Sequence, residues 1–247
     1  MALALADRLR AGGGDAVAIG ADALQVYEGL GALTGAAGPL QRERLEHRLV
    51  GFVPVTAKFD VGQYMPLAHA EVDAALAAAR TPIVVGGTGL YMRAALAELS
   101  LRPARPGEES ELWSAETRHP SLVIGLNMDR ARLYERIDRR VDEILAGGAR
   151  AEVLAAEEAG ASRTARKALG FDELLAGDLD GMRRRSRNYA RRQLTWMRKV
   201  PSLHEVDVTA RAPEEVAEAI DSLMTEDLVG RPRRTWRRPA RAGPGPL

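Results

Sequence analysis

Short apolar runs that alternate with helical segments constrain this chain more than any other feature. Such runs occupy residues 16–21, 83–85 and 121–126, and a segment of helical composition follows each one. An apolar run without polar alternation is typical of a strand that is covered on both faces, so we predict three buried strands. Strands separated by helices predict a parallel sheet with helices on both faces, which is the α/β class.

The clearest helix is predicted from Asp129 to about Ala146, because its apolar residues share one face and Gly147 follows it. We also expect helices over residues 2–10, 71–80, 90–96, 150–159, 168–176, 180–199 and 213–224, a weaker strand over residues 203–208, and loops over residues 34–40 and 102–120. The length of 247 residues suits one large domain. We therefore expect a single domain over residues 1–228 and a disordered Arg/Pro/Gly-rich tail over residues 229–247.

Composition limits the cellular location of the chain and the kinds of site that it can contain. It contains no cysteine and no run of eighteen apolar residues, and its first residues lack the pattern of a signal peptide. Disulfides and thiolate metal sites are thus excluded, and the four histidines show no metal-binding spacing. We expect a cytoplasmic monomer without a metal cluster built from protein ligands.

Basic residues are concentrated in two segments although the formal net charge is only +1. Residues 183–199 contain eight Lys or Arg and no acid, and residues 231–241 contain six Arg and no acid. A basic stripe indicates an anionic partner such as RNA, but it is equally compatible with a solvated helix face. For residues 183–199 both interpretations stay open, and for the tail we favour disorder.

Polar groups follow the predicted strands at the edge where an α/β sheet binds ligands. Asp22 follows the first strand, and the turn Gly86-Gly87-Thr88-Gly89 follows the second. An aspartate there can be a general base, or it can cap the next turn. The Gly-rich turn can present backbone N–H groups to an anion, or it can be an ordinary tight turn. We place the candidate site near Asp22 and Thr88.

Arginines supply two further candidates. Arg136 and Arg140 lie four residues apart, opposite the apolar face of their helix, where guanidinium groups can clamp a diphosphate. The alternative is pairing with Asp138 and Asp142 along the helix. Residues 188–198 (NYARRQLTWMR) interleave Arg with Tyr, Trp and Gln, a pattern that can hold phosphates and a base. The alternative is an amphipathic helix whose Tyr, Trp and Met are buried.

Four segments in this order resemble the tRNA dimethylallyltransferase family: residues 21–27 (ADALQVY), 84–91 (VVGGTGLY), 133–140 (LYERIDRR) and 190–198 (ARRQLTWMR). Residues 166–171 (RKALGF) resemble the family's short basic-Gly-aromatic segment, and the match covers roughly residues 2–208. The resemblance implies a P-loop NTPase-like three-layer core with a parallel sheet and additional C-terminal helices. It raises the functional interpretations of Asp22, Thr88 and Arg140 above their structural alternatives.

The resemblance further implies transfer of a dimethylallyl group from dimethylallyl diphosphate to N6 of the adenine beside the tRNA anticodon. Asp22 matches the general base, and Thr88 and Arg140 match residues that steady the bridging oxygen and the leaving diphosphate, with Arg136 assigned to diphosphate binding. Mg²⁺ is implied to accompany the diphosphate. Residues that match contacts to the tRNA anticodon stem-loop are Asp22, Ala23, Leu24, Gln25, Lys167, Ala168, Leu169, Gly170, Phe171, Asp172, Arg191, Arg192, Gln193, Leu194, Thr195, Trp196, Met197 and Arg198.

The chain departs from the family pattern in three places. The family has a Gly-rich phosphate-binding loop ending in Lys-Ser/Thr before the helix that matches residues 2–9, and here Met1 stands where that loop ends. We therefore expect a chain truncated before this helix. Residues 102–120 occupy the place of a long helical insertion, and Ala23 replaces a small hydroxyl residue.

Two other functions stay open on the sequence. An adenylate isopentenyltransferase, which prenylates a free nucleotide, agrees with the short insertion. A non-catalytic RNA-binding remnant agrees with the missing loop. The motif at residues 190–198 favours tRNA as the acceptor, and the joint presence of Asp22, Thr88 and Arg140 favours catalysis.

Overall fold

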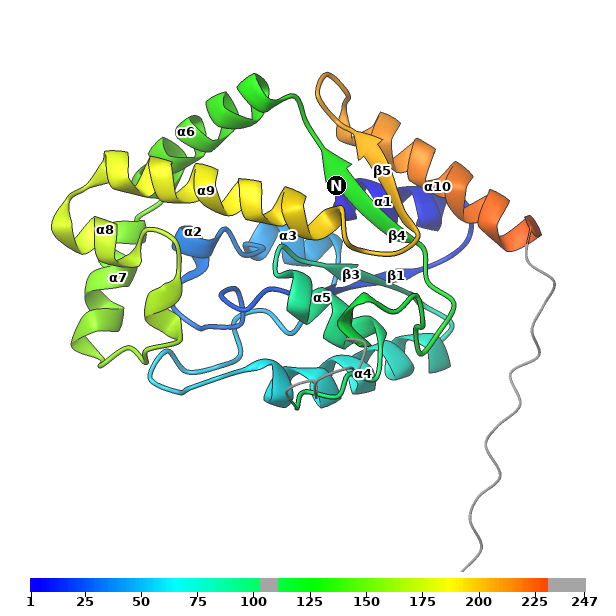
Figure 1. Cartoon of the computed structure of the whole chain (residues 1–247), viewed down its shortest axis with the longest axis horizontal. Helices are drawn as coiled ribbons and strands as arrows, with labels where there is room; N and C mark the ends of the chain where they lie inside the picture. The colour runs from blue at the N-terminus through cyan, green and yellow to red at the C-terminus, as the bar shows by residue number, and fades with distance from the viewer. Residues whose placement is uncertain (103–110, 231–247) are drawn as a thin grey trace, which may run out of the picture.

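The computed structural model describes residues 1–102 and 111–230, with side chains described up to residue 226 (Figure 1). Its helices are α1 (Ala2–Ala11), α2 (Gly31–Thr34), α3 (Pro39–Arg44), α4 (Val61–Ala77), α5 (Gly89–Leu96), α6 (Arg130–Ala146), α7 (Ala149–Glu158), α8 (Phe171–Ala176), α9 (Leu179–Met197) and α10 (Pro213–Gly230). Its strands are β1 (Ala16–Gly20), β2 (His47–Arg48), β3 (Thr81–Val85), β4 (Val123–Asn127) and β5 (Leu203–Asp207). Single 3₁₀ turns cover Glu111–Trp113 and Ala165–Lys167.

All strand pairs in the named sheets are parallel, as predicted, but within the described residues the strands form two sheets and not one. One sheet has the order β2-β1-β3, with Ala18 opposite Ile83, and the other pairs β4 with β5. The α/β class is confirmed. The prediction of three buried strands is correct for β1 alone, since β3 and β4 are only partly buried.

The larger hydrophobic core extends from α4 and α5, past the loop after β1, to α7 and α8. Tyr64 of α4 is fully buried there, and its hydroxyl donates to the carbonyl of Gly20 at 2.9 Å. The Tyr64 and Tyr91 rings pack with centroids 4.5 Å apart. This packing fixes the carboxyl end of β1, where the candidate site begins.

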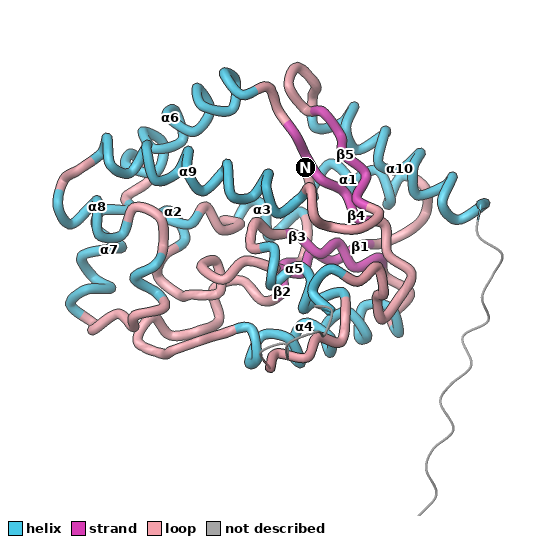
Figure 2. Tube along the Cα trace, in the orientation of Figure 1, coloured by secondary structure: helices cyan, strands magenta, loops and turns pink. Residues whose placement is uncertain are grey.

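A second cluster lies between α1, α10 and the inner residues of both sheets. Leu5, Val206 and Val216 are buried there, and Ile83 of β3 and Ile124 of β4 pack against the same cluster. The α1–α10 pair therefore supports both sheets (Figures 1 and 2).

Helix boundaries differ from the sequence predictions where capping or tertiary contacts decide. Helix α4 begins ten residues earlier than predicted, because Asp60 accepts hydrogen bonds from the Gly62 and Gln63 amides. The short elements α2, α3 and β2 were not predicted. Helix α2 depends on a distant residue, since Glu152 accepts from the amides of Ala32 and Leu33. The segment predicted as a loop over residues 34–40 is therefore partly helical: α2 ends at Thr34, and α3 begins at Pro39.

Asp129, which follows β4, caps α6 by accepting from the amides of Ala131 and Arg132. The predicted helix over residues 213–224 extends to Gly230. The prediction of a disordered tail over residues 229–247 is wrong for residues 229 and 230, which belong to α10, and residues 231–247 lie outside the described residues. Among the described helices, none combines the length and the apolar composition that a membrane span requires.

Candidate active site

The turn between β3 and α5 brings the two predicted site residues together. The Thr88 hydroxyl oxygen accepts a hydrogen bond from the Ala23 amide at 3.2 Å, which ties the turn to the residue after Asp22. Oδ1 of Asp22 accepts from the amides of Leu24 at 2.9 Å and Gln25 at 3.3 Å. Asp22 thus caps its own turn through one oxygen. Its second oxygen, Oδ2, faces Gly87, at 3.5 Å from where a Cβ would be.

Helix α9 packs directly on this turn. Gln193 Nε2 donates to the Gly87 carbonyl at 2.9 Å, and the Tyr189 hydroxyl donates to the same oxygen at 3.2 Å. A Cβ at Gly87 would lie 2.3 Å from Gln193 Nε2, and one at Gly89 would lie 2.1 Å from the Trp196 ring. The glycines of the turn are therefore required for the close approach of α9, which brings its side chains beside Asp22.

The charge of Asp22 acts on three tyrosines in its vicinity. Burial raises the pKa of Tyr189, and the nearby charge of Asp22 raises it further. Burial is also the main cause that raises the pKa of Tyr64 and of Tyr91, with a contribution from Asp22 in both. All three phenols therefore stay protonated at neutral pH, and the Tyr64 and Tyr189 hydroxyls donate to the carbonyls of Gly20 and Gly87.

Tyr189 is the site residue that sequence reasoning missed as a hydrogen-bond donor to the turn, because it was expected either as an aromatic that meets a base or as a buried aromatic. Its ring is half-buried, yet its hydroxyl reaches the Gly-rich turn. The available signal was its spacing, since Tyr189 and Gln193 lie four residues apart on one helix face. Spacing alone does not say which element that face contacts.

Arg136 and Arg140 lie on the exposed face of α6. The predicted alternative, pairing with Asp138 and Asp142, is wrong, because Asp138 pairs with Arg187 and Asp142 with Arg183 of α9. Within the described residues neither Arg136 nor Arg140 has an acidic partner.

The two helical arginines are not in direct contact with Asp22 or Thr88 in the described structure. The Arg140 guanidinium lies over the backbone of Gly35, whose added Cβ would meet it at 1.6 Å. Gln25, three residues after Asp22, donates to the carbonyls of Thr34 at 3.2 Å and Gly35 at 3.4 Å. One loop therefore connects Arg140 to the Asp22 turn.

The basic stripe of residues 183–199 divides into two halves with different partners. Arg183, Arg185 and Arg187 form ion pairs with acids of α6 and α8. In the second half, the exposed basic residues have no acidic partner among the residues that the structure describes; they are Arg191, Arg192, Arg198 and Lys199. The first half is therefore an ion-paired contact between helices and not a solvated face, whereas binding of an anionic partner by the second half stays a prediction.

The segment that resembles the basic-Gly-aromatic motif is largely structural. Ala168 and Phe171 are fully buried, and Arg166 lies over the Phe171 ring at 5.2 Å. Lys167 and Asp172 are exposed. A contact from this segment to RNA would come from these exposed residues or from backbone atoms, and that contact stays a prediction.

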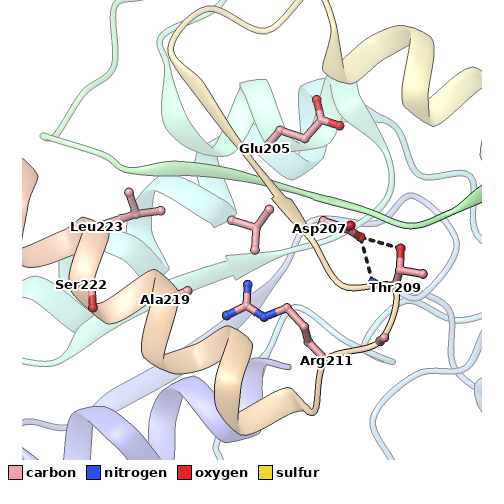
Figure 3. A pocket seen from close by; sticks show the side chains of 9 residues that line it. Glu205, Asp207, Thr209, Arg211, Ala219, Ser222 and Leu223 are labelled. Carbon is pink, nitrogen blue, oxygen red and sulfur yellow. Dashed lines mark hydrogen bonds between the residues drawn. The ribbon is translucent and has the colours of Figure 1, made fainter.

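Two pockets lie at the ends of the strands and beside α9 and α10. A cavity of about 1010 Å³ opens beside the Gly-rich turn, and Thr88, Tyr189, Gln193 and Trp196 line part of it. A second, more open hollow of about 730 Å³ lies between β5 and α10 (Figure 3). There Asp207 accepts from the amide and hydroxyl of Thr209, and these bonds lower the Asp207 pKa. No residue of the Asp22 turn lines the second hollow.

The residues at the sheet edge define a class: an α/β enzyme with a carboxylate, a hydroxyl and a side-chain amide at a Gly-rich turn. The family model described as IPP transferase matches residues 25–119 and 105–200. The chain belongs to this family.

Relatives and solved structures agree with that assignment. The tRNA dimethylallyltransferases of Salinispora arenicola and Thermobifida fusca are each 31% identical to the chain. The alignments cover 78% of this chain and 75% of the first relative, and 83% of this chain and 84% of the second. The tRNA isopentenylpyrophosphate transferase of Bacillus halodurans, at 23% identity, superposes with a TM-score of 0.79 over 92% of this chain and 91% of that one. The structural likeness confirms the fold.

Proposed function

We propose that this chain is a transferase that moves a dimethylallyl group from dimethylallyl diphosphate to N6 of the adenine beside the anticodon of tRNA. The observation that carries the proposal is the convergence of Asp22, Thr88, Tyr189 and Gln193 on the Gly87 turn. Two features of the relatives, their name and their sequence identity over most of the chain, support the same reaction.

The proposed chemistry uses the free oxygen of Asp22. The N6 lone pair forms a bond to C1 of the dimethylallyl group while the bond from C1 to the bridging oxygen breaks, and diphosphate leaves. Asp22 Oδ2 accepts the proton that N6 loses. The Thr88 oxygen already accepts a hydrogen bond from Ala23, so its own proton is available for the bridging oxygen.

Arg136 and Arg140 are proposed to bind the diphosphate, because no described acid neutralises them and guanidinium groups match phosphate oxygens. Mg²⁺ is proposed to arrive as part of the diphosphate substrate and to neutralise its charge. Among the described residues no group of three His, Cys, Asp or Glu is placed to hold a metal. An ion held mainly by phosphate oxygens and water, as Mg²⁺ commonly is, does not require such a group.

The tRNA is proposed to lie along the second half of α9. Arg191, Arg192 and Arg198 are exposed and have no acidic partner among the described residues, so their charges are available for phosphates. Gln193 uses its amide nitrogen on Gly87, which leaves Oε1 as an acceptor for an adenine amino group. The anticodon stem-loop, the monomeric state and the cytoplasmic location belong to the same proposal.

The test is transfer of labelled dimethylallyl diphosphate to unmodified tRNA with Mg²⁺, using the 247-residue chain and its Asp22→Asn variant. We expect the variant to lose transfer by about 10²- to 10⁴-fold, the range for removal of a general base. Asp129→Asn is the matched control, since Asp129 follows β4 but caps α6, a role that Asn also fills.

Two results would reject this function in favour of the alternatives. Transfer to AMP in the absence of tRNA would identify an enzyme that prenylates free nucleotides. Binding of tRNA without any transfer, by the chain and by both variants alike, would identify a non-catalytic RNA-binding protein.

A further inference from the structure

Residues 111–119, which precede β4, form a segment that is attached to the helices around the candidate site. Its regular structure is the single 3₁₀ turn Glu111–Trp113. Its backbone is bound to the end of α5, since the Arg118 amide donates to the Leu96 carbonyl at 2.8 Å. The Arg118 side chain pairs with Asp73 of α4 at 2.9 Å. The segment is therefore built onto the core, and its side chains have defined neighbours.

Arg93 of α5 holds the backbone on both sides of Trp113. Its side chain is 3% exposed, and this burial lowers its pKa. Arg93 has no acidic partner among the described residues; instead, its guanidinium donates to the Leu112 carbonyl at 3.1 Å and to the Glu116 carbonyl at 3.4 Å. A buried charge is costly unless its N–H groups are bonded, so these two bonds tie the segment to α5.

The fixed backbone places the Trp113 ring against the carboxyl end of α9. The Trp113 and Trp196 rings pack with centroids 4.7 Å apart and planes tilted by 51°. Lys199, which follows α9, has its Nζ over the Trp113 ring at 5.3 Å from the centroid, within the range of a cation–π contact. Two side chains at the end of α9 therefore contact one side chain of the segment.

Trp196 in turn reaches the Gly-rich turn. Its ring occupies the space where a side chain of Gly89 would lie, since a Cβ there would be 2.1 Å from the ring. Gly89 directly follows Thr88, whose hydroxyl belongs to the candidate site. A chain of contacts thus runs from Trp113 through Trp196 to the residue beside Thr88.

Trp196 lies on the same face of α9 as the two residues that bind the Gly87 carbonyl. Tyr189, Gln193 and Trp196 are spaced four and three residues apart, which places them on one side of a helix. All three line the cavity beside the turn, which β3 and β4 also line. Because side chains next to a cavity lack packing on that side, Trp196 depends on support from its other neighbours, and Trp113 is one of them.

We propose that Trp113 is a positioning residue for dimethylallyl transfer: by packing on Trp196 it keeps that ring on Gly89 and holds α9 in place at the Gly-rich turn. The inference rests on the proposed function. Trp113 acts through α9 and not through the substrates. Its loss therefore lowers the rate of the chemical step, while the exposed cations of α9 still bind tRNA.

The first experiment compares transfer by the wild-type chain, Trp113→Ala and Trp113→Phe. We expect kcat to fall by roughly 10- to 10²-fold in Trp113→Ala, with KM for tRNA nearly unchanged, because the reacting groups are misplaced by a fraction of an ångström to about 1 Å. Phenylalanine should restore most of kcat, since its ring can also pack on Trp196. Arg118→Ala is the matched control, because it loosens the same segment from Asp73 of α4 and leaves the Trp113 ring in place.

A double variant tests the route through Trp196. If Trp113 acts through that ring, Trp113→Ala should add little further loss of kcat in a Trp196→Ala background, since residues that act through one contact are not additive. Losses that add fully in the double variant overturn the proposed route.

A further measurement does not depend on transfer. The chain has four glutamines, so isotope-labelled glutamine gives few side-chain amide signals, and the spectrum of Gln193→Ala assigns the one that donates to Gly87. We expect solvent exchange of this amide to be several-fold faster in Trp113→Ala and unchanged in Arg118→Ala, because loosening of α9 opens its hydrogen bond.

The outcomes separate this proposal from its alternatives. A raised KM for tRNA with unchanged kcat in Trp113→Ala would identify a direct RNA contact and overturn the positioning role. Equal losses of kcat in Trp113→Ala and Arg118→Ala would show that only attachment of the segment matters, and would overturn it as well. If the wild-type chain transfers no label, the proposed function fails, whereas exchange of the Gln193 amide still decides whether Trp113 positions α9.

Discussion

At Gly87 a single missing side chain determines how the candidate site is assembled. The Gly87 carbonyl accepts hydrogen bonds from both Tyr189 and Gln193, and the space where its Cβ would lie is occupied by the Gln193 amide. Gln193 and the nearby Asp22 oxygen come from elements far apart in the chain. Their separation is therefore set by how closely α9 approaches this turn.

Gly87→Ala is expected to reduce dimethylallyl transfer at least tenfold, because the new methyl group displaces Gln193 from the turn. A displacement of about 1 Å near the reacting groups can lower a rate by 10²-fold. The measurement is kcat/KM for tRNA together with the unfolding midpoint. Gly38→Ala is the matched control, since nothing lies within 4 Å of its added Cβ. Equal activity in the two variants would show that the approach of α9 does not matter.

Some residues of the site could be predicted from the sequence, and others could not. Asp22 and Thr88 were predicted together because each follows an apolar strand, and their turns are in contact as expected. The contact of Arg140 with the loop at Gly35 was not predictable, because it depends on how α6 packs against a turn with positive φ. Tyr189 was missed as a hydrogen-bond donor to the turn for a similar reason, since its role depends on helix docking.

At the scale of an element, α9 combines two functions along its length. Its first half is held to α6 and α8 by ion pairs, and its second half presents exposed cations that have no acidic partner among the described residues. The sequence showed the eight basic residues but could not divide them, because the acids that pair with them lie on other helices.

Arg198→Ala is expected to weaken tRNA binding and to lower the slope of log K against log salt by about one, as for the loss of one phosphate contact. Arg183→Ala is the matched control on the same helix. It removes the pairs with Asp142 and Asp180, whose carboxylates are exposed, so we expect little change in stability. Binding measured from low to high salt distinguishes the variants, and an unchanged slope in Arg198→Ala would contradict the assignment.

Arg118 and His119, which precede β4, are held to α4 by a cluster of charged side chains. Asp73 of α4 accepts from Arg118 at 2.9 Å and contacts His119 Nε2 at 2.7 Å. The hydrogen bond from Arg118 is the main cause that lowers the Asp73 pKa, and His119 lowers it further. Because the folded-state pKa is depressed, this stabilisation is present above the unfolded pKa and is lost as pH falls through the folded value.

Asp73→Asn is therefore expected to destabilise the chain at pH 7, and the difference from wild type should shrink as pH falls below about 4, near the ordinary pKa of Asp. Urea unfolding of both proteins at several pH values measures that difference. A difference that stays constant from pH 7 to pH 3 would show that the carboxylate charge of Asp73 does not stabilise the fold.

At the scale of the whole molecule, the sequence predicted the parallel α/β class but not the division into two sheets. The three apolar runs look alike in the sequence, yet β1 is buried while Val85 and Leu126 remain about two-fifths exposed. Composition indicates the surroundings that a strand requires. The strands that actually lie beside it depend on the order of the strands in the sheet, and the hydrophobic pattern of the sequence does not give that order.

This difference between strands predicts an uneven stability across the fold. Strand β1 has a partner on each side, whereas β3 and β4 have one each among the described strands and face the cavity. Native-state hydrogen exchange should therefore be slowest for the paired amides of β1 and several-fold faster for those of β3 and β4, because less packing opposes their local opening. Equally slow exchange in all three strands would show that the two sheets unfold as one unit, and that the apolar cavity between them does not weaken either edge.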